Sequence, residues 1–133
     1  KLLVTWRLLE ARRAAPVLFE AGRYRPIATQ GERADNLCAF QRAYDQSALL
    51  VIVPRLVAPW TALPDCWPIG ATPWQGTDVL VPEADAARCW HNVFSGEPLA
   101  PGTGSDDGSV RVAADRLLST FPIGVWVRGA AAV

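Results

Sequence analysis

Three tryptophans in a proline-rich segment are the residues of this sequence best suited to hold a ligand. Trp60, Trp67 and Trp74 recur at intervals of seven within residues 54–76, which also contain five prolines. The face of an indole ring can stack on the C–H face of a sugar ring, and prolines stiffen the loop that carries it. We therefore treat these three as candidate substrate-binding residues. The alternative, which we favour, is that they bury apolar area and pin a long loop to the core.

Catalysis is not predicted from the remaining polar residues. Hydrolysis of a glycosidic bond needs two carboxylates that flank the bond on a rigid scaffold. The acids of this chain lie on a helix surface, at strand ends, or in a glycine-rich tip with Asp106 and Asp107. His91 is the single histidine, and no glycine-rich loop opens a helix to hold phosphate. We expect no catalytic residues, no metal and no cofactor.

The three cysteines predict free thiols rather than a disulfide framework. Cys38, Cys66 and Cys89 are an odd number at wide spacings, which also argues against a zinc knuckle. We expect reduced thiols in a reducing compartment. Cys38 falls inside an apolar strand pattern, and free cysteine is commonly buried, so we expect it in the core.

Composition excludes several classes of partner. Thirteen basic and thirteen acidic residues cancel, so no basic field attracts nucleic acid. The longest apolar run, ALLVIVP, is far shorter than the ~20 residues that cross a bilayer. Nothing at the N-terminus has the uninterrupted apolar segment of a secretory signal. We expect one cytoplasmic domain with no membrane contact, since 133 residues suit a single core.

Residues 1–15 have the pattern of a helix, ended by Pro16 and a further turn to Gly22. The helix carries two neighbouring apolar stripes, Leu2, Trp6 and Leu9, and Val4, Leu8 and Ala11. Because the sequence opens inside this pattern and lacks methionine, we expect Lys1 to be a cut within a longer protein. A helix this apolar needs cover on more than one side, so we expect an uncovered patch and a dimer through residues 1–13.

After Gly22 the apolar pattern alternates with a period of two, which is typical of strands. Predicted strands span residues 24–28, 37–44, 49–53, 77–81, 90–94, 110–113 and 123–127, with a helical turn at 115–118. Residues 37–44 and 49–53 should form a hairpin in which Phe40, Leu50 and Ile52 are buried. Pro26 places the first strand at an edge. Prolines leave residues 54–76 as a loop without regular structure. The sequence therefore predicts a mainly β fold, an antiparallel β-sandwich preceded by one N-terminal helix.

Several motifs in this order resemble a known enzyme family. They are LLEARRAAPVLFEAGRYRPI, RADNLCAFQRAY, VIVPRLV, CWHNVFSGE and LLSTFPIGVWV. The first resembles the end of the last barrel helix in the α-amylase superfamily. The whole series, which spans nearly the entire chain, resembles the C-terminal domain of maltooligosyl trehalose synthases in glycoside hydrolase family 13. In one place the chain departs from the family, because Gly76 stands where an acid is usual.

The resemblance implies an accessory domain of an isomerase that converts the reducing-end α-1,4 linkage of maltooligosaccharides to an α,α-1,1 linkage. It implies that the catalytic carboxylates lie in an upstream barrel, so none is carried over to this chain. Residues 1–22 would then be the last barrel helix with its connecting turn, and residues 23–133 the C-terminal β-sandwich. Two alternatives stay open. One is a carbohydrate-binding module that docks a maltooligosaccharide or longer α-glucan through the tryptophan-bearing loop, and the other is a purely structural interaction domain.

Overall fold

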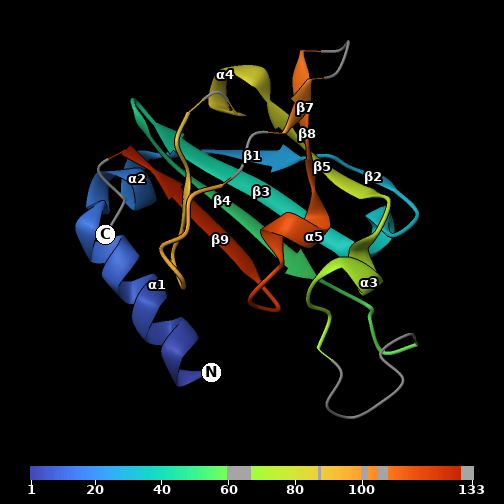
Figure 1. Cartoon of the computed structure of the whole chain (residues 1–133). Coiled ribbons are helices and arrows are strands. Elements are labelled where there is room, and N and C mark those ends of the chain that lie inside the picture. The colour runs from blue at the N-terminus through green and yellow to red at the C-terminus, as the bar shows by residue number, and fades with distance from the viewer. Residues whose placement is uncertain (60–66, 87, 100–101, 105–107, 130–133) are drawn as a thin grey trace.

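The computed structural model describes residues 1–59, 67–86, 88–99, 102–104 and 108–129. The elements in chain order are α1 (Leu2–Ala14), α2 (Pro16–Ala21), β1 (Arg23–Ile27), β2 (Thr29–Gly31), η1 (Ala34–Asn36), β3 (Leu37–Tyr44), β4 (Ser47–Pro54), α3 (Ala71–Trp74), β5 (Thr77–Pro82), α4 (Glu83–Ala86), β6 (His91–Asn92), β7 (Thr103–Gly104), β8 (Ser109–Ala113), α5 (Ala114–Leu117) and β9 (Gly124–Arg128). A five-stranded sheet has the order β1-β3-β4-β9-β6, and a four-stranded sheet has the order β2-β5-β8-β7. All the strand pairs are antiparallel, which confirms the predicted sandwich after an N-terminal helix (Figure 1).

The β3–β4 hairpin forms the centre of the larger sheet, as predicted. Its eight residue pairs run from Leu37↔Pro54 to Tyr44↔Ser47, and the two-residue turn places Asp45 at φ 50°. β4 lies between β3 and β9 and is apolar on both faces. Leu50 and Ile52 face the smaller sheet and are fully buried, while Leu49 faces the helices. A central strand covered on both sides explains the unbroken apolar run.

The predicted alternation along β3 is correct, but its inward face was assigned wrongly. Cys38 is exposed rather than in the core, and Phe40 is only half-buried against Tyr24. The register pairs Phe40 with Val51, so Phe40 lies on the opposite face of the sheet from Leu50 and Ile52. The side that faces the smaller sheet is formed by residues of modest apolarity, namely Leu37, Ala39, Gln41 and Ala43.

The two N-terminal helices cover the outer face of the larger sheet (Figure 1). Ala15 and Leu18 are buried there against Leu49 and Val127 of the sheet. Pro16 separates the helices, since the preceding Ala15 has φ −136° and leaves the helical region. α2 ends where the backbone of Gly22 becomes extended, and the position requires glycine because a Cβ there would lie 2.1 Å from the carbonyl oxygen of Leu18. Whether residues 1–22 belong to a separate domain stays a prediction.

Two local predictions were wrong in extent. Residues 54–76 are not without regular structure, because α3 forms one helical turn there. The strand predicted at residues 90–94 contains only His91 and Asn92, since the Asn92 side-chain oxygen accepts the backbone N–H groups of Phe94 and Ser95 and turns the chain. Pro26 does lie in an edge strand, as predicted.

Gly76, where the resembling family has an acid, stands at the entry to β5. Its φ is +69°, in the left-handed region, and a Cβ there would have nothing within 4 Å. The position therefore has room for a side chain but favours glycine for its backbone conformation. In the part of the chain that the structure describes, no helix is long and apolar enough to span a bilayer.

Candidate functional site

The three candidate tryptophans have different surroundings. Trp60 lies outside the described residues. Trp74 is 1% exposed and Trp67 is 69% exposed. Trp74 therefore fulfils the structural role that we favoured, while Trp67 retains an indole surface that a ligand can reach.

Trp74 ties the loop to the core through packing and a hydrogen bond. Its ring belongs to the core cluster between the two sheets, and its Nε1 donates to the carbonyl oxygen of Pro68 at 2.8 Å. The next turn is also fixed, because the Gly70 N–H donates to the carbonyl oxygen of Leu118 at 3.0 Å. Trp67 directly precedes this anchored segment, so its backbone is held while its ring stays at the surface.

α1 exposes an apolar surface on the side that does not pack on the sheet. Leu2 is 85% exposed, Trp6 is 52% exposed and Leu9 is 48% exposed. We call these three residues the outer stripe. Val4 and Leu8 are half-buried and Ala11 is buried, so the second stripe packs inward. The two stripes predicted from the sequence thus separate into a covered face and an uncovered face, and several hundred Å² of exposed apolar surface marks an interaction site in most proteins.

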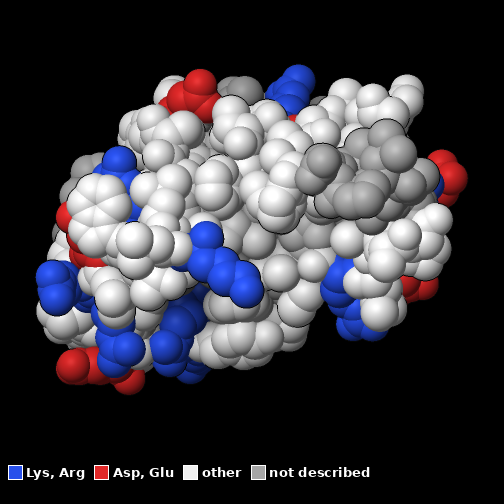
Figure 2. Space-filling model, turned by 90° about the horizontal axis from the view of Figure 1, so that it is seen from below, with Lys and Arg blue, Asp and Glu red and all other residues white. Residues whose placement is uncertain are grey.

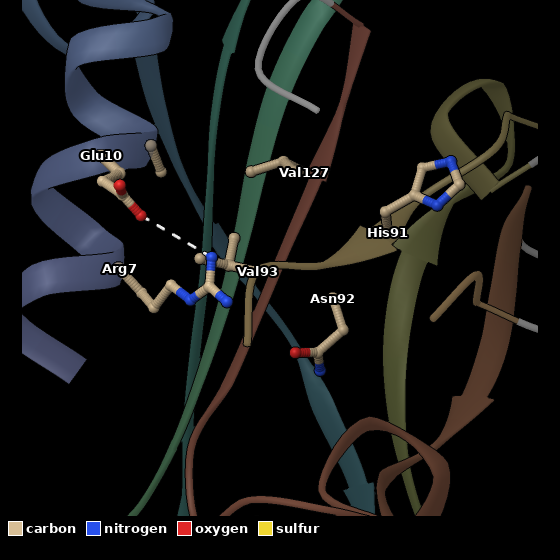
Figure 3. Close-up of a pocket in the computed structure, with 7 residues that line it drawn as sticks. Arg7, Glu10, His91, Asn92, Val93 and Val127 are labelled. Carbon is tan, nitrogen blue, oxygen red and sulfur yellow. Dashed lines mark ion pairs between the residues drawn. The ribbon is translucent and has the colours of Figure 1, made fainter. Parts of the chain in front are cut away.

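A small cavity of about 20 Å³, room for one water molecule, lies between α1 and the end of the larger sheet (Figure 3). Arg7 and Glu10 reach into it from the helix with an ion pair of 3.7 Å, while the His91 ring points away from that pair (Figure 3). Glu10 is the one carboxylate among the described lining residues. Glycosidic chemistry needs two carboxylates, so this cavity does not support that reaction.

A largely buried polar cluster joins α4 to the larger sheet. Asp85 forms an ion pair with Arg128 of β9 and accepts a hydrogen bond of 3.0 Å from the side chain of Gln41 in β3. The indole of Trp90 donates to the backbone oxygen of Asp85 at 2.8 Å, and the Arg128 guanidinium lies 5.4 Å from the centre of that ring. Burial lowers the pKa of Arg128, and the Asp85 charge acts against this effect. The Arg128 Nε is buried without a hydrogen-bond partner, but the other contacts named here join the side chains of the cluster to one another, so we assign it a structural role.

No group of three or more potential metal ligands occurs within the described residues. Cys38 and Cys89 are free thiols at the surface, and Cys66 is not among the described residues. The sequence did not point to Ile69, Phe121 and Ile123, which border an open groove beside Trp67. The sequence indicated a binding site at these residues only weakly, because isolated apolar residues next to prolines are equally typical of ordinary loop packing.

Neither a comparison with protein-family models nor a comparison with curated proteins gives a match for this chain.

Proposed function

We propose that this chain is an accessory β-domain of a cytoplasmic enzyme that isomerises maltooligosaccharides to trehalosyl products, and that its helix α1 supports a catalytic barrel. The outer stripe carries the proposal, because its three large apolar side chains, Leu2, Trp6 and Leu9, are each about half-exposed or more. Large exposed apolar patches mark sites of contact with another protein surface. A catalytic barrel ahead of α1 in the same polypeptide would supply that surface.

The arrangement of the N-terminal residues supports the same reading. The segment that resembles the end of a barrel helix, residues 8–27, forms the second half of α1, the break at Pro16, the short helix α2 and the first strand. Leu8 of α1 already packs on the cluster that covers the larger sheet, so the helix can connect two layers by burying its other side. A purely structural domain would use the same contact, but it would not be tied to trehalosyl product formation.

The proposal places the catalytic carboxylates outside this chain. The isolated 133-residue chain should therefore form no trehalosyl product from maltoheptaose, as measured by chromatography after long incubation. Turnover that rises with the concentration of this chain would overturn the proposal.

A second experiment tests the contact itself. The proposed catalytic barrel is expressed together with this chain, and trehalosyl product formation is measured for the wild type and for Trp6→Glu with Leu9→Glu. We expect activity in the wild type and a large loss in the double variant, because two carboxylates would be buried at the contact. The matched control is Tyr44→Ser, which removes a similarly exposed ring (47% exposed) from the β3–β4 hairpin. Equal losses in the variant and the control would contradict the assignment of the contact to α1.

A further inference from the structure

A groove runs beside Trp67 at the end of the molecule where α1 begins. Its volume is about 730 Å³, within the range of small-molecule and cofactor sites. α1, the segment leading into α3 and the turn after α5 form its walls, and the described lining residues include Val4, Thr5, Trp67, Ile69, Phe121 and Ile123. Seen from this end, most of the central surface is uncharged (Figure 2). We call this feature the Trp67 groove.

Both sides of the Trp67 groove are fixed by contacts to the core. On one side Pro68 is buried, its oxygen accepts the Trp74 indole N–H, and the Ile69 N–H closes a tight turn to the Trp67 oxygen at 2.8 Å. On the other side the Phe121 ring stacks on Phe94, with ring centres 4.8 Å apart. A binding surface that is already held in place loses little conformational entropy when a ligand arrives.

The chemistry of the groove favours a neutral, hydroxyl-rich ligand with an apolar face. Among the described lining residues Lys1 is the only charged one, so neither an anion nor a cation finds a set of counter-charges there. The exposed indole of Trp67 offers a flat apolar surface. The hydroxyl of Thr5 donates to the Lys1 carbonyl oxygen at 3.3 Å and so presents lone pairs outward, where a ligand hydroxyl can donate to it. Thr120 adds a second exposed hydroxyl on the opposite wall.

The groove and the outer stripe are separate surfaces of α1. Val4 is two residues from both Leu2 and Trp6, so it projects about 160° away from them around the helix, since successive residues advance by about 100°. Thr5 lies between the two surfaces, about 40° from Leu9 around the helix. A protein that covers the outer stripe therefore need not fill the groove. A protein segment in the groove would have to bury the polar groups at both rims, whereas a sugar can satisfy them with its own hydroxyls.

We infer that the Trp67 groove is a binding site for a linear α-1,4-glucan, with one glucosyl ring stacked on the Trp67 indole. The choice of an α-glucan over other neutral sugars rests on the proposed function, while the stacking on Trp67 rests on the groove alone. A catalytic domain seated on the outer stripe would border this groove, so a glucan bound here would be held close to the enzyme that acts on it.

Titration of the 133-residue chain with maltoheptaose, followed by NMR of the indole N–H signals, tests the inference. We expect the indole N–H signal of Trp67 to shift in a saturable way. The affinity for maltoheptaose should be about tenfold weaker in Trp67→Ala, because an aromatic contact worth about 1 kcal/mol or somewhat more is lost. Trp6→Ala is the matched control, since Trp6 is also exposed but lies outside the groove, and it should bind as the wild type does. Ile69→Asp, which places a charge in the groove, should also weaken binding.

Cellohexaose, the β-1,4 counterpart, is titrated in parallel and should bind more weakly by about tenfold or more. Absence of saturable binding by either sugar, or equal binding by wild type and Trp67→Ala, would overturn the site. Equal binding of the two sugars would overturn its assignment to α-glucan. Binding of an apolar peptide but of neither sugar would also overturn the assignment of the groove to a sugar. None of these results bears on the proposed accessory function, which depends on the outer stripe and on product formation.

Discussion

Trp74 donates its indole N–H to the carbonyl oxygen of Pro68 at 2.8 Å, in the buried interior beneath the proline-rich segment. This bond joins two parts of the same loop that are six residues apart, and the ring packs into the core between the sheets. The loop thereby gains an anchor that its five prolines alone would not provide. Trp67 precedes this anchor by one residue, so a structural tryptophan positions the candidate binding tryptophan.

Removal of the Trp74 N–H should destabilise the fold. Trp74→Phe keeps most of the ring but leaves the Pro68 oxygen without this donor, and we expect a loss of about 1–3 kcal/mol in the free energy of unfolding. Trp74→Ala should cost more, about 3–5 kcal/mol, because it also opens a cavity. Urea unfolding followed by circular dichroism measures both. Trp67→Ala is the control and should unfold close to the wild type, because its ring is mostly exposed.

The ion pair between Asp85 and Arg128 should contribute strongly to the free energy of unfolding. Asp85→Ala leaves the buried guanidinium of Arg128 without its counter-charge, and breaking a buried ion pair in this way costs about 3–5 kcal/mol. The loop between β5 and β6 should loosen first, because Asp85 also receives hydrogen bonds from Gln41 and Trp90. Urea unfolding of the variant measures the cost.

The matched control for Asp85 is Glu10→Ala, which breaks the half-exposed Arg7–Glu10 pair of α1. That change should cost less than about 1 kcal/mol, as surface ion pairs do. Equal stabilities of the two variants would show that Arg128 finds other partners.

The opposite faces of β3 and β4 give a direct test of the register. Leu50→Ala should reduce the free energy of unfolding by about 2–5 kcal/mol, because Leu50 is fully buried between the sheets. Phe40→Ala should cost only about 1–2 kcal/mol, since Phe40 is half-buried on the other face and chiefly loses its contact with Tyr24. A larger cost for Phe40 than for Leu50 would contradict this register.

The sequence predicted the strands well because alternation and turn residues are local signals. The hairpin of residues 37–44 and 47–54 follows from its two apolar runs and the polar turn between them. The face of β3 could not be predicted, because Gln41 lies on the buried face, where its side chain bonds to Asp85, a residue 44 positions away. Local apolarity favoured the Phe40 side, whereas a long-range polar contact placed Gln41 in the interior.

The candidate site was predictable only in part, for a related reason. The spacing of Trp67 and Trp74 suggested a shared role, but one ring is buried and the other exposed because only Trp74 faces the core from α3. The other wall of the groove comes from Phe121 and Ile123, which are about 50 residues later in the chain. No local pattern links these residues to Trp67. Their proximity depends on the antiparallel pairing of β9 with β4 and on the turn that precedes β9.

The isolated chain should self-associate through α1. The sequence predicted a dimer through residues 1–13, and the structure narrows the expected contact to the outer stripe. In the 133-residue chain alone, the outer stripe stays exposed among the residues that the structure describes, and exposed apolar surface tends to pair with a second copy of itself. A two-fold arrangement in which the stripes of two copies pack against each other is the simplest closed form. Sedimentation equilibrium should show dimers whose fraction rises with protein concentration.

Trp6→Glu with Leu9→Glu should weaken this association by at least about tenfold, because like charges would meet across the two-fold axis. The stability of the fold should change little, since both side chains are about half-exposed and lie away from the sheet. Tyr44→Ser, which removes an exposed ring elsewhere, should leave the dimer intact. If the proposed catalytic domain uses the same stripe, its addition should also convert dimers to a one-to-one complex. A chain that stays monomeric at every concentration, or a dimer that the charged variant does not disturb, would show that the outer stripe is not a surface for self-association.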